Sequence, residues 1–350
     1  LSLLYLPRNN AIRFPLSQYR YLYLPALYTP VPFTSETSTL PYSALERSGI
    51  ADITRPPLSL SGLGTIIAVI DSGIDYTSPA FRNPDGTSRI LAIWDQTVSG
   101  SPPAKFPYGS LYTKAQIDTA LLSSSPRDLV PTYDSGNRHG TRLAAIAAGS
   151  DSAEEEYRGA APLASLVIVK LKPAKQYLKD YYAIRNDALC YEESDLINAL
   201  KFVAGYHVPL FSPLSVLIGV GSNLGDHNGT SFLENYMNRL CTLPGFTITV
   251  PAGNEANKKH HYRGTFTTDT TQPQVIELDV AENNSGFLLQ FFGSITNRFS
   301  LSVKTPLGEE INRISYDLER SVRYSFLYDR ASIDADSLIS DPLSAEEAIY

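Results

Sequence analysis

The sequence predicts an α/β protein built on a mainly parallel sheet. The chain has 350 residues, of which 43% are hydrophobic, so it can bury a large core in one large domain or two ordinary ones. The β-branched run Ile66–Ile70 is bounded by turn residues, as expected for a strand covered on both faces. From Gly64 onward, apolar strands alternate with helical patterns, which indicates a parallel sheet with helical crossovers.

Residues 1–57 precede this alternation and differ from it in composition. They are rich in Tyr, Pro and Leu, as in the stretch YRYLYLPALYTPVPF, and proline interrupts their helix and strand patterns. We interpret them as an N-terminal arm or the remnant of a leader segment. Leu1–Leu6 lacks the basic start and cleavage site of a signal peptide, but a chain that begins with Leu leaves a targeting signal open.

Residues 58–258 carry the alternating strands and helices. The stretch SDLINALKFVAG has apolar residues at helical spacing, so we expect a helix that Ser194 caps and Gly205 ends. A second helix is expected to begin at His139 and to end near Gly149. The predicted strands are Thr65–Ile70, Leu166–Leu171, Val216–Val220 and Phe246–Val250.

Residues 259–350 show the alternation of apolar and polar side chains that half-exposed antiparallel strands have. The stretches VIELDV and FSLSV carry this pattern. Turn signals follow at Asn283-Asn284 and at Pro306-Leu307-Gly308. We therefore predict the start of a β-sandwich module. The side chains expected to face its interior are Ile276, Leu278 and Val280, with Glu277 and Asp279 facing outward.

The composition excludes several classes of protein. A net charge of -7 without a basic patch argues against nucleic-acid binding, and the short run Lys258–His261 is interpreted as a solvated loop. The two cysteines, Cys190 and Cys241, have neither metal-ligand spacing nor a disulfide framework, which fits a reducing compartment. No apolar segment is long enough to span a membrane. We expect no cofactor and no metal, and no loop carries enough acidic residues for a calcium site.

Three polar residues follow predicted strands or open a helix. Asp71 ends the first strand, where α/β proteins place catalytic groups, although Asp in that position also caps turns. His139 begins a helix; it is either a plain surface residue or a base, since imidazole titrates near neutral pH. Asn254 follows the last strand, and its amide could donate a hydrogen bond to charge that develops on a carbonyl oxygen.

Asp, His and Asn in this order on one α/β chain resemble the subtilases, the subtilisin-like serine proteases, whose triad runs Asp, His, Ser. The similarity covers roughly residues 60–258. It implies a doubly wound parallel sheet with helices on both faces. The matching stretches are AVIDSGID around Asp71, HGTRLA around His139, RGAAPLASL from Arg158, IGVGS from Ile218 and PAGNE around Asn254.

The resemblance also implies roles for these residues. Asp71 would orient the imidazole of His139, which would act as general base and then as general acid. Asn254 would supply the side-chain donor of the oxyanion hole. The exposed backbone of Gly219, Val220 and Gly221 would pair with the polypeptide substrate as an added strand. The glycines of GVGSNLG have the wrong spacing for a dinucleotide-binding loop.

A triad also needs a nucleophile, and no serine of the chain fits. Ser231 lies in a Gly-Thr-Ser stretch, but it precedes Asn254 and forms a plausible capping box with Glu234. The similar stretch Asp85–Ser88 is interpreted as a turn, and no serine after Asn254 follows a Gly-Thr pair. We therefore expect the nucleophilic serine to lie outside this chain.

Within the subtilases, the chain resembles the clostridial Csp-type germination proteases. The resemblance rests on GIDYTSPAFRNPDGTSRILAIWDQT, the long region before His139, and the β-sandwich pattern after Asn254. It implies that residues 1–57 are the end of the protein's own prodomain. It also implies that residues 259–350 begin an inserted jelly-roll module that is incomplete in this chain. Arg142 and Ala145 depart from many subtilases, which carry His and Gly there.

The expected function is therefore that of a serine endopeptidase whose substrate is a polypeptide, such as the precursor of a spore cortex hydrolase. The alternative is a pseudoprotease that keeps the fold as a binding or signalling module. In either case this piece alone is expected to be inactive, because it lacks the nucleophile. The resemblance implies a cytoplasmic or spore-associated protein of a bacterium.

Overall fold

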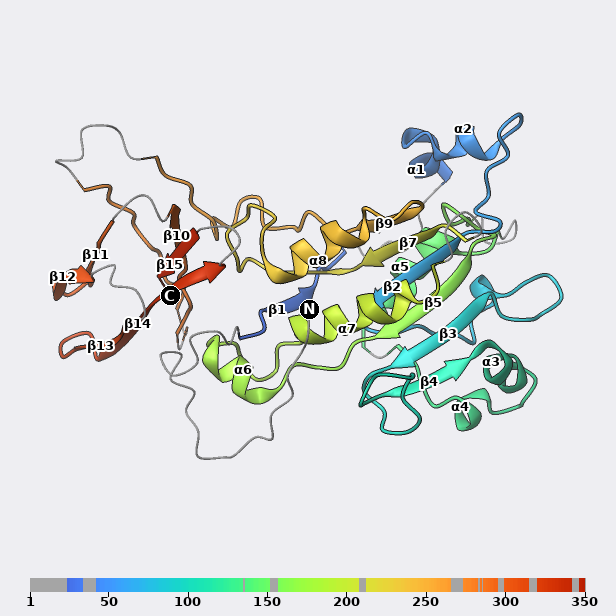
Figure 1. The fold of residues 1–350 in the computed structure, drawn as a ribbon, viewed down its shortest axis with the longest axis horizontal. Helices are drawn as coiled ribbons and strands as arrows, with labels where there is room; N and C mark the ends of the chain where they lie inside the picture. The colour runs from blue at the N-terminus through green and yellow to red at the C-terminus, as the bar shows by residue number, and fades with distance from the viewer. Residues whose placement is uncertain are drawn as a thin grey trace.

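A computed structural model describes most of the chain, and its centre is a six-stranded sheet in the order β4-β3-β5-β2-β7-β9 (Figure 1). All neighbouring strands run parallel except β4, which pairs antiparallel with β3 at one edge. The predicted α/β fold with a mainly parallel sheet is therefore confirmed. The strands are β2 (Ile66–Asp71), β3 (Ile90–Asp95), β4 (Ser110–Thr113), β5 (Ser165–Lys170), β7 (Leu214–Ile218) and β9 (Phe246–Thr249). The described residues are 24–33, 42–134, 136–151, 157–207, 212–265, 273–282, 284, 286–294, 299–314, 320–341 and 346–349.

The four predicted strands correspond to β2, β5, β7 and β9, with ends that differ by one or two residues. Two strands, β3 and β4, were not predicted. The stretch ILAIWD of β3 is an apolar run that is buried along almost its whole length, so the same pattern could have indicated it. β4 is an edge strand of only four residues, too short for its alternation to stand out.

Helices cover both faces of the sheet (Figure 1). On one face, α7 and α8 pack on β2, β5 and β7 through a large apolar cluster that includes Trp94 and Phe202. On the other face, α3 and α5 pack on β2, β3 and β5 through a cluster that includes Ile93 and Ala144. The helices are α3 (Lys114–Leu121), α4 (Pro126–Leu129), α5 (His139–Ala148), α6 (Gln176–Tyr181), α7 (Glu193–Ala204) and α8 (Phe232–Leu240), and a short 3-10 turn spans Pro79–Phe81.

The predicted helix ends are confirmed except for one cap. α5 begins at His139 and ends at Ala148 with Gly149 as its C-cap, and α7 ends at Ala204 with Gly205 as its C-cap. The prediction that Ser194 caps α7 is wrong, because the helix begins at Glu193 and its N-cap is Glu192. The Ser194 hydroxyl instead contacts Glu192 Oε2 at 3.3 Å.

The N-terminal arm contains regular structure despite its prolines. Two short helices, α1 (Tyr42–Arg47) and α2 (Ile50–Thr54), precede the sheet. Strand β1 (Leu27–Pro30) lies between β6 (Tyr191–Glu192) and β8 (Val220–Gly221) in a separate antiparallel sheet of three strands. The arm is therefore hydrogen-bonded to segments that follow β5 and β7.

The C-terminal region forms antiparallel sheets of four and two strands, in the orders β10-β15-β14-β13 and β11-β12. An apolar cluster that includes Ile311 and Phe326 joins residues of both sheets. The jelly-roll arrangement stays a prediction. The strands are β10 (Phe291–Ser294), β11 (Leu301–Lys304), β12 (Glu310–Ile314), β13 (Arg320–Phe326), β14 (Ala331–Asp341) and β15 (Glu346–Ile349).

Of the two stretches predicted to be strands in this region, only one is. FSLSV overlaps β11, and the expected turn at Pro306-Leu307-Gly308 follows it, with Gly308 at a φ of 87°. VIELDV forms no strand among the described residues, and the prediction that its apolar side chains face inward is wrong. Ile276, Leu278 and Val280 are 39%, 50% and 49% exposed, because no strand pairs with this stretch to define a covered face. The turn predicted at Asn283-Asn284 includes Asn283, which lies outside the described residues.

Candidate active site

Asp71 is the last residue of β2, at the carboxyl end of a strand in the middle of the sheet. Its side chain is almost fully buried, at 1% exposure. Asp71 Oδ1 accepts a hydrogen bond of 2.7 Å from the Ser72 amide, so the residue does fix the start of the following turn. The same oxygen also lies 2.8 Å from His139 Nδ1, which no turn cap requires.

His139 is the first residue of α5, and a polar network fixes this end of the helix. Asp134 accepts hydrogen bonds from the amide and the hydroxyl of Thr141, at 2.8 and 2.7 Å. The Ser72 hydroxyl accepts from the Gly140 amide at 2.9 Å and donates to Asp134 at 2.8 Å. The turn after Asp71 and the helix that carries His139 are therefore held together by hydrogen bonds. Ser72, Asp134 and Thr141 were not predicted to be positioning residues, although all three lie in the polar stretches around Asp71 and His139.

Gly219 leaves the space that the Asp71 carboxylate occupies. A Cβ at Gly219 would lie 2.0 Å from Asp71 Oδ2 and 2.2 Å from Leu143 Cδ1, so no side chain fits there. Asp71 Oδ2 itself has no hydrogen-bond partner within the described part of the chain. One oxygen of Asp71 thus binds His139 while the other packs against the Gly219 backbone.

The two ring nitrogens of His139 both face oxygen acceptors. Nδ1 lies 2.8 Å from Asp71 Oδ1, and Nε2 lies 2.7 Å from the carbonyl oxygen of Val31. A neutral imidazole can donate to only one of them, so this geometry fits the protonated ring. Burial alone would lower the pKa of His139, but the hydrogen bond and charge of Asp71, helped by the Val31 carbonyl, outweigh burial and raise that pKa.

The predicted substrate strand pairs with the arm. Thr29 lies opposite Gly221 and Pro30 opposite Val220 in the β1–β8 pair. The Val31 amide donates to the Gly219 carbonyl at 3.0 Å, which brings the arm to His139. The backbone of Gly219, Val220 and Gly221 therefore presents hydrogen-bonding groups to an antiparallel polypeptide strand. On its other edge, the arm pairs with Tyr191 and Glu192, which the sequence analysis did not single out because two residues carry no detectable alternation.

Asn254 meets the next residues of the arm. Its Nδ2 donates a hydrogen bond of 2.6 Å to the Pro32 carbonyl. The Phe33 ring packs on the His139 ring with 5.0 Å between centroids, and the Arg142 guanidinium lies 4.2 Å from the centroid of Phe33. Asp71, His139 and Asn254 are therefore gathered around consecutive arm residues. Arg142, which departs from the subtilase pattern, has a packing role here.

The two serines considered as nucleophiles have local structural roles. The Ser231 hydroxyl accepts from the Glu234 amide at 3.3 Å, and the Glu234 carboxylate accepts from the Ser231 amide at 2.9 Å. This is the capping box predicted for α8. Ser88 is fully buried and its hydroxyl accepts from the Ile90 amide. Neither hydroxyl is bonded to His139.

The described residues include no group of three or more His, Cys, Asp or Glu side chains that could hold a metal ion. In the basic run Lys258–His261, the exposed His260 pairs with Glu255 at 2.8 Å. Among the helices that the structure describes, none is both long and apolar enough to cross a membrane.

Comparisons with known proteins point to one family. The sequence model of the Subtilase family matches residues 62–189. The Arabidopsis thaliana protein named Subtilisin-like protease SBT2.2 is 28% identical over 132 residues, which are 35% of this chain and 14% of that protein. The solved structure of the Clostridium perfringens CspB protease matches with a TM-score of 0.71 and 27% identity, over 88% of this chain and 60% of that chain.

The chain thus spans 60% of the CspB chain that it matches and a much smaller part of the plant protease. The family match includes both Asp71 and His139, and the structural match covers 88% of this chain. Residues 62–189 therefore match the subtilase family, and the chain has the subtilisin-like fold of the Clostridium perfringens CspB protease.

Proposed function

We propose that this chain is part of a serine endopeptidase in which Asp71, His139 and Asn254 serve catalysis. The observation that carries the proposal is the 2.8 Å contact between two buried side chains, Asp71 and His139, at the carboxyl end of β2. An aspartate in that position holds the imidazole in one tautomer and stabilises its cation. Nε2 is then free to exchange a proton with a nucleophile once the arm leaves.

In this proposal the nucleophile is a serine supplied by sequence outside this chain. Ser231 and Ser88 are committed to local hydrogen bonds, and the Val31 carbonyl occupies the position beside Nε2 that a serine hydroxyl would take. Asn254 would stabilise the oxyanion, since its amide already donates to a main-chain carbonyl of the arm. Residues 58–258 would form the N-terminal part of the catalytic domain, and residues 259–350 would begin an inserted module.

The arm would be the protein's own inhibitory prodomain segment. It pairs with Gly219–Gly221 as an added strand, which is how a polypeptide substrate would bind. It also keeps His139 paired with two oxygens, and a protonated imidazole cannot accept the proton of a nucleophile. The docked arm would therefore block both the substrate path and the base.

A fluorophosphonate probe tests the proposal on the longer protein that contains the missing serine. The probe is expected to label that protein, and an Asp71→Asn or His139→Ala variant is expected to lose the labelling. The proposal would be contradicted if the longer protein carries the catalytic serine and the probe never labels it. Ala or Gly in place of the serine would favour the alternative, a pseudoprotease that binds polypeptides without cleaving them.

The natural substrate would be another protein. By its likeness to Csp-type proteases, we propose the precursor of a spore-germination hydrolase. Incubating the longer protein with such a precursor and sequencing the products by mass spectrometry tests this step separately from the probe reaction.

A further inference from the structure

The arm also contacts a part of the protein away from His139. Residues 172–193, which we call the 172–193 lobe, connect β5 to the start of α7 and contain α6 and β6. Leu27 of the arm is 4% exposed and packs into an apolar pocket of this lobe. What we call the pocket is the apolar cluster around Leu27, made of the buried Leu178 and Cys190 and the partly buried Ala174, Tyr177, Tyr182 and Ile184 of the lobe, together with the partly buried Leu24 of the arm.

Glu193 binds the main chain of the residue before Leu27. The Ala26 amide donates to Glu193 Oε2 at 3.1 Å, and the Glu193 amide donates to the Ala26 carbonyl at 2.9 Å. The other carboxylate oxygen, Oε1, accepts from the Leu233 amide at 3.3 Å, and Glu193 is only 2% exposed. The carboxylate thus lies between the start of α8 and the arm, and it binds the arm through groups that every residue except proline offers.

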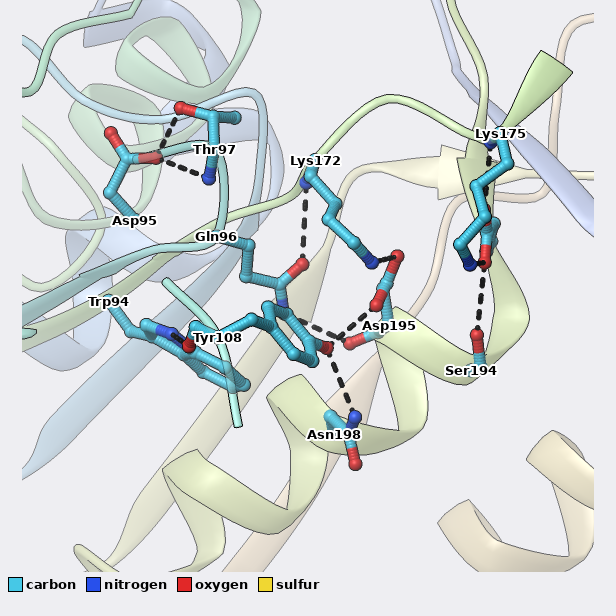
Figure 2. Close-up of polar contacts among 11 residues, drawn as sticks. Trp94, Asp95, Gln96, Thr97, Tyr108, Lys172, Lys175, Ser194, Asp195 and Asn198 are labelled. Carbon is cyan, nitrogen blue, oxygen red and sulfur yellow. Dashed lines mark hydrogen bonds and ion pairs between the residues drawn. The ribbon is translucent and has the colours of Figure 1, made fainter. Parts of the chain in front are cut away.

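The lobe is anchored to the body of the protein without help from the arm. Figure 2 shows Lys172 reaching Asp195 of α7, which ties the lobe to the body of the protein. Inside the lobe, the Lys175 amine lies 2.7 Å from Glu192 Oε2. The Lys175 amide donates to Glu192 Oε1 at 2.8 Å. Within the lobe, the Lys179 amine donates to the Ala188 carbonyl at 2.7 Å. Asp195 and Glu192 are almost fully buried, so these contacts hold the backbone around the pocket in place.

We propose that the 172–193 lobe is an extended substrate subsite. It would bind a leucine-like side chain four positions before the residue whose carbonyl meets His139, while Glu193 binds the preceding main chain. This inference rests on the proposed function, because it assumes that a polypeptide substrate replaces the arm on the same path. β6 and β8 offer their main-chain groups to any antiparallel strand, so a substrate in that register would place its own side chain where Leu27 lies. The ligand class is an extended polypeptide with an apolar residue at that position.

Peptide hydrolysis by the longer, serine-containing protein tests the subsite. The parent peptide carries arm residues 26–33, and its variants carry Leu27→Ala or, as a control at an exposed position, Thr29→Ser. Losing the buried part of a leucine is expected to lower kcat/KM by about tenfold to a hundredfold, and the control should lie within about twofold of the parent. An Ala174→Phe enzyme, whose pocket is filled, should lose most of the preference for leucine over alanine. Misfolding would lower both rates and leave their ratio unchanged.

Equal cleavage of the leucine and alanine peptides would overturn the subsite and leave the protease function standing. Cleavage of none of the peptides, together with failure of the fluorophosphonate reaction, would overturn the protease function and the substrate role with it. Hydrogen exchange of this 350-residue chain then tests the pocket itself. Leu27→Ala should speed exchange of the Ala26 and Val31 amides by about tenfold or more, whereas Thr29→Ser should not. Unchanged rates would overturn binding at the pocket as well.

Discussion

Replacing Gly219 by alanine is expected to separate Asp71 from His139. The added Cβ would lie 2.0 Å from Asp71 Oδ2, whereas ordinary van der Waals contact begins at 3.4 Å. The carboxylate would therefore have to retreat by about 1.4 Å if it alone moved. Its contact with His139 Nδ1, now 2.8 Å, would then open beyond hydrogen-bonding distance. If the Gly219 backbone moved as well, the adjoining strand β8, which binds the arm, would be disturbed.

The expected cost of Gly219→Ala is about 1–3 kcal/mol in the free energy of unfolding, the usual range for overpacking a buried site. The pKa of His139 should also fall, because its anionic partner moves away while burial remains. Urea unfolding measures the first effect, and an NMR titration of the His139 Cε1 proton measures the second. Gly221→Ala is the matched control, since a Cβ there meets only the tip of Val31, Cγ2, at 3.2 Å.

Gly221→Ala should weaken docking of the arm and leave the Asp71 contact with His139 intact. If the Gly219→Ala chain unfolds at the wild-type urea concentration and its His139 titrates at the wild-type pH, the reasoning from close packing is refuted. The same holds if both glycine variants lower the stability and the His139 pKa equally.

Three further perturbations have directions that the structure fixes. Asp71→Asn should lower the pKa of His139, because it removes the negative charge that counteracts the lowering of that pKa by burial. An NMR titration measures the change, and an unchanged His139 pKa would contradict the prediction. Burial raises the pKa of Glu193 from 4.5 to about 7, so protonation favours the folded state. This protonation should contribute about 3 kcal/mol to the free energy of unfolding below pH 4.5, and the contribution should be lost as the pH rises through about 7. In the Glu193→Gln variant, the urea midpoint of unfolding should change less over this pH range. Arg89→Leu should lower the free energy of unfolding by at least about 3 kcal/mol, because the buried guanidinium donates to three main-chain carbonyls. Calorimetry measures this loss with Arg89→Lys as the control, and a clearly smaller loss for Arg89→Leu would contradict the prediction.

Much of the central fold could be predicted because its strands are buried on both faces. Such strands leave continuous apolar runs, and helices that cover a sheet leave apolar residues at helical spacing. The same reasoning failed for VIELDV, where alternation was present but none of the described strands pairs with it. It also failed at Ser194, since capping is decided by main-chain geometry over a single residue.

The sequence by itself determined four central strands, β2, β5, β7 and β9, and helices α5 and α7 between them. It also singled out Asp71, His139 and Asn254, because polar residues at the ends of apolar runs are visible locally. Only the tertiary structure decided that the arm lies between β6 and β8, with Val31 at His139 and Leu27 in the 172–193 lobe. Those contacts join residues more than a hundred positions apart in the chain. Strand pairing over such distances depends on complementary backbone edges that meet in space, and a short proline-rich segment carries no periodic pattern that indicates its partner.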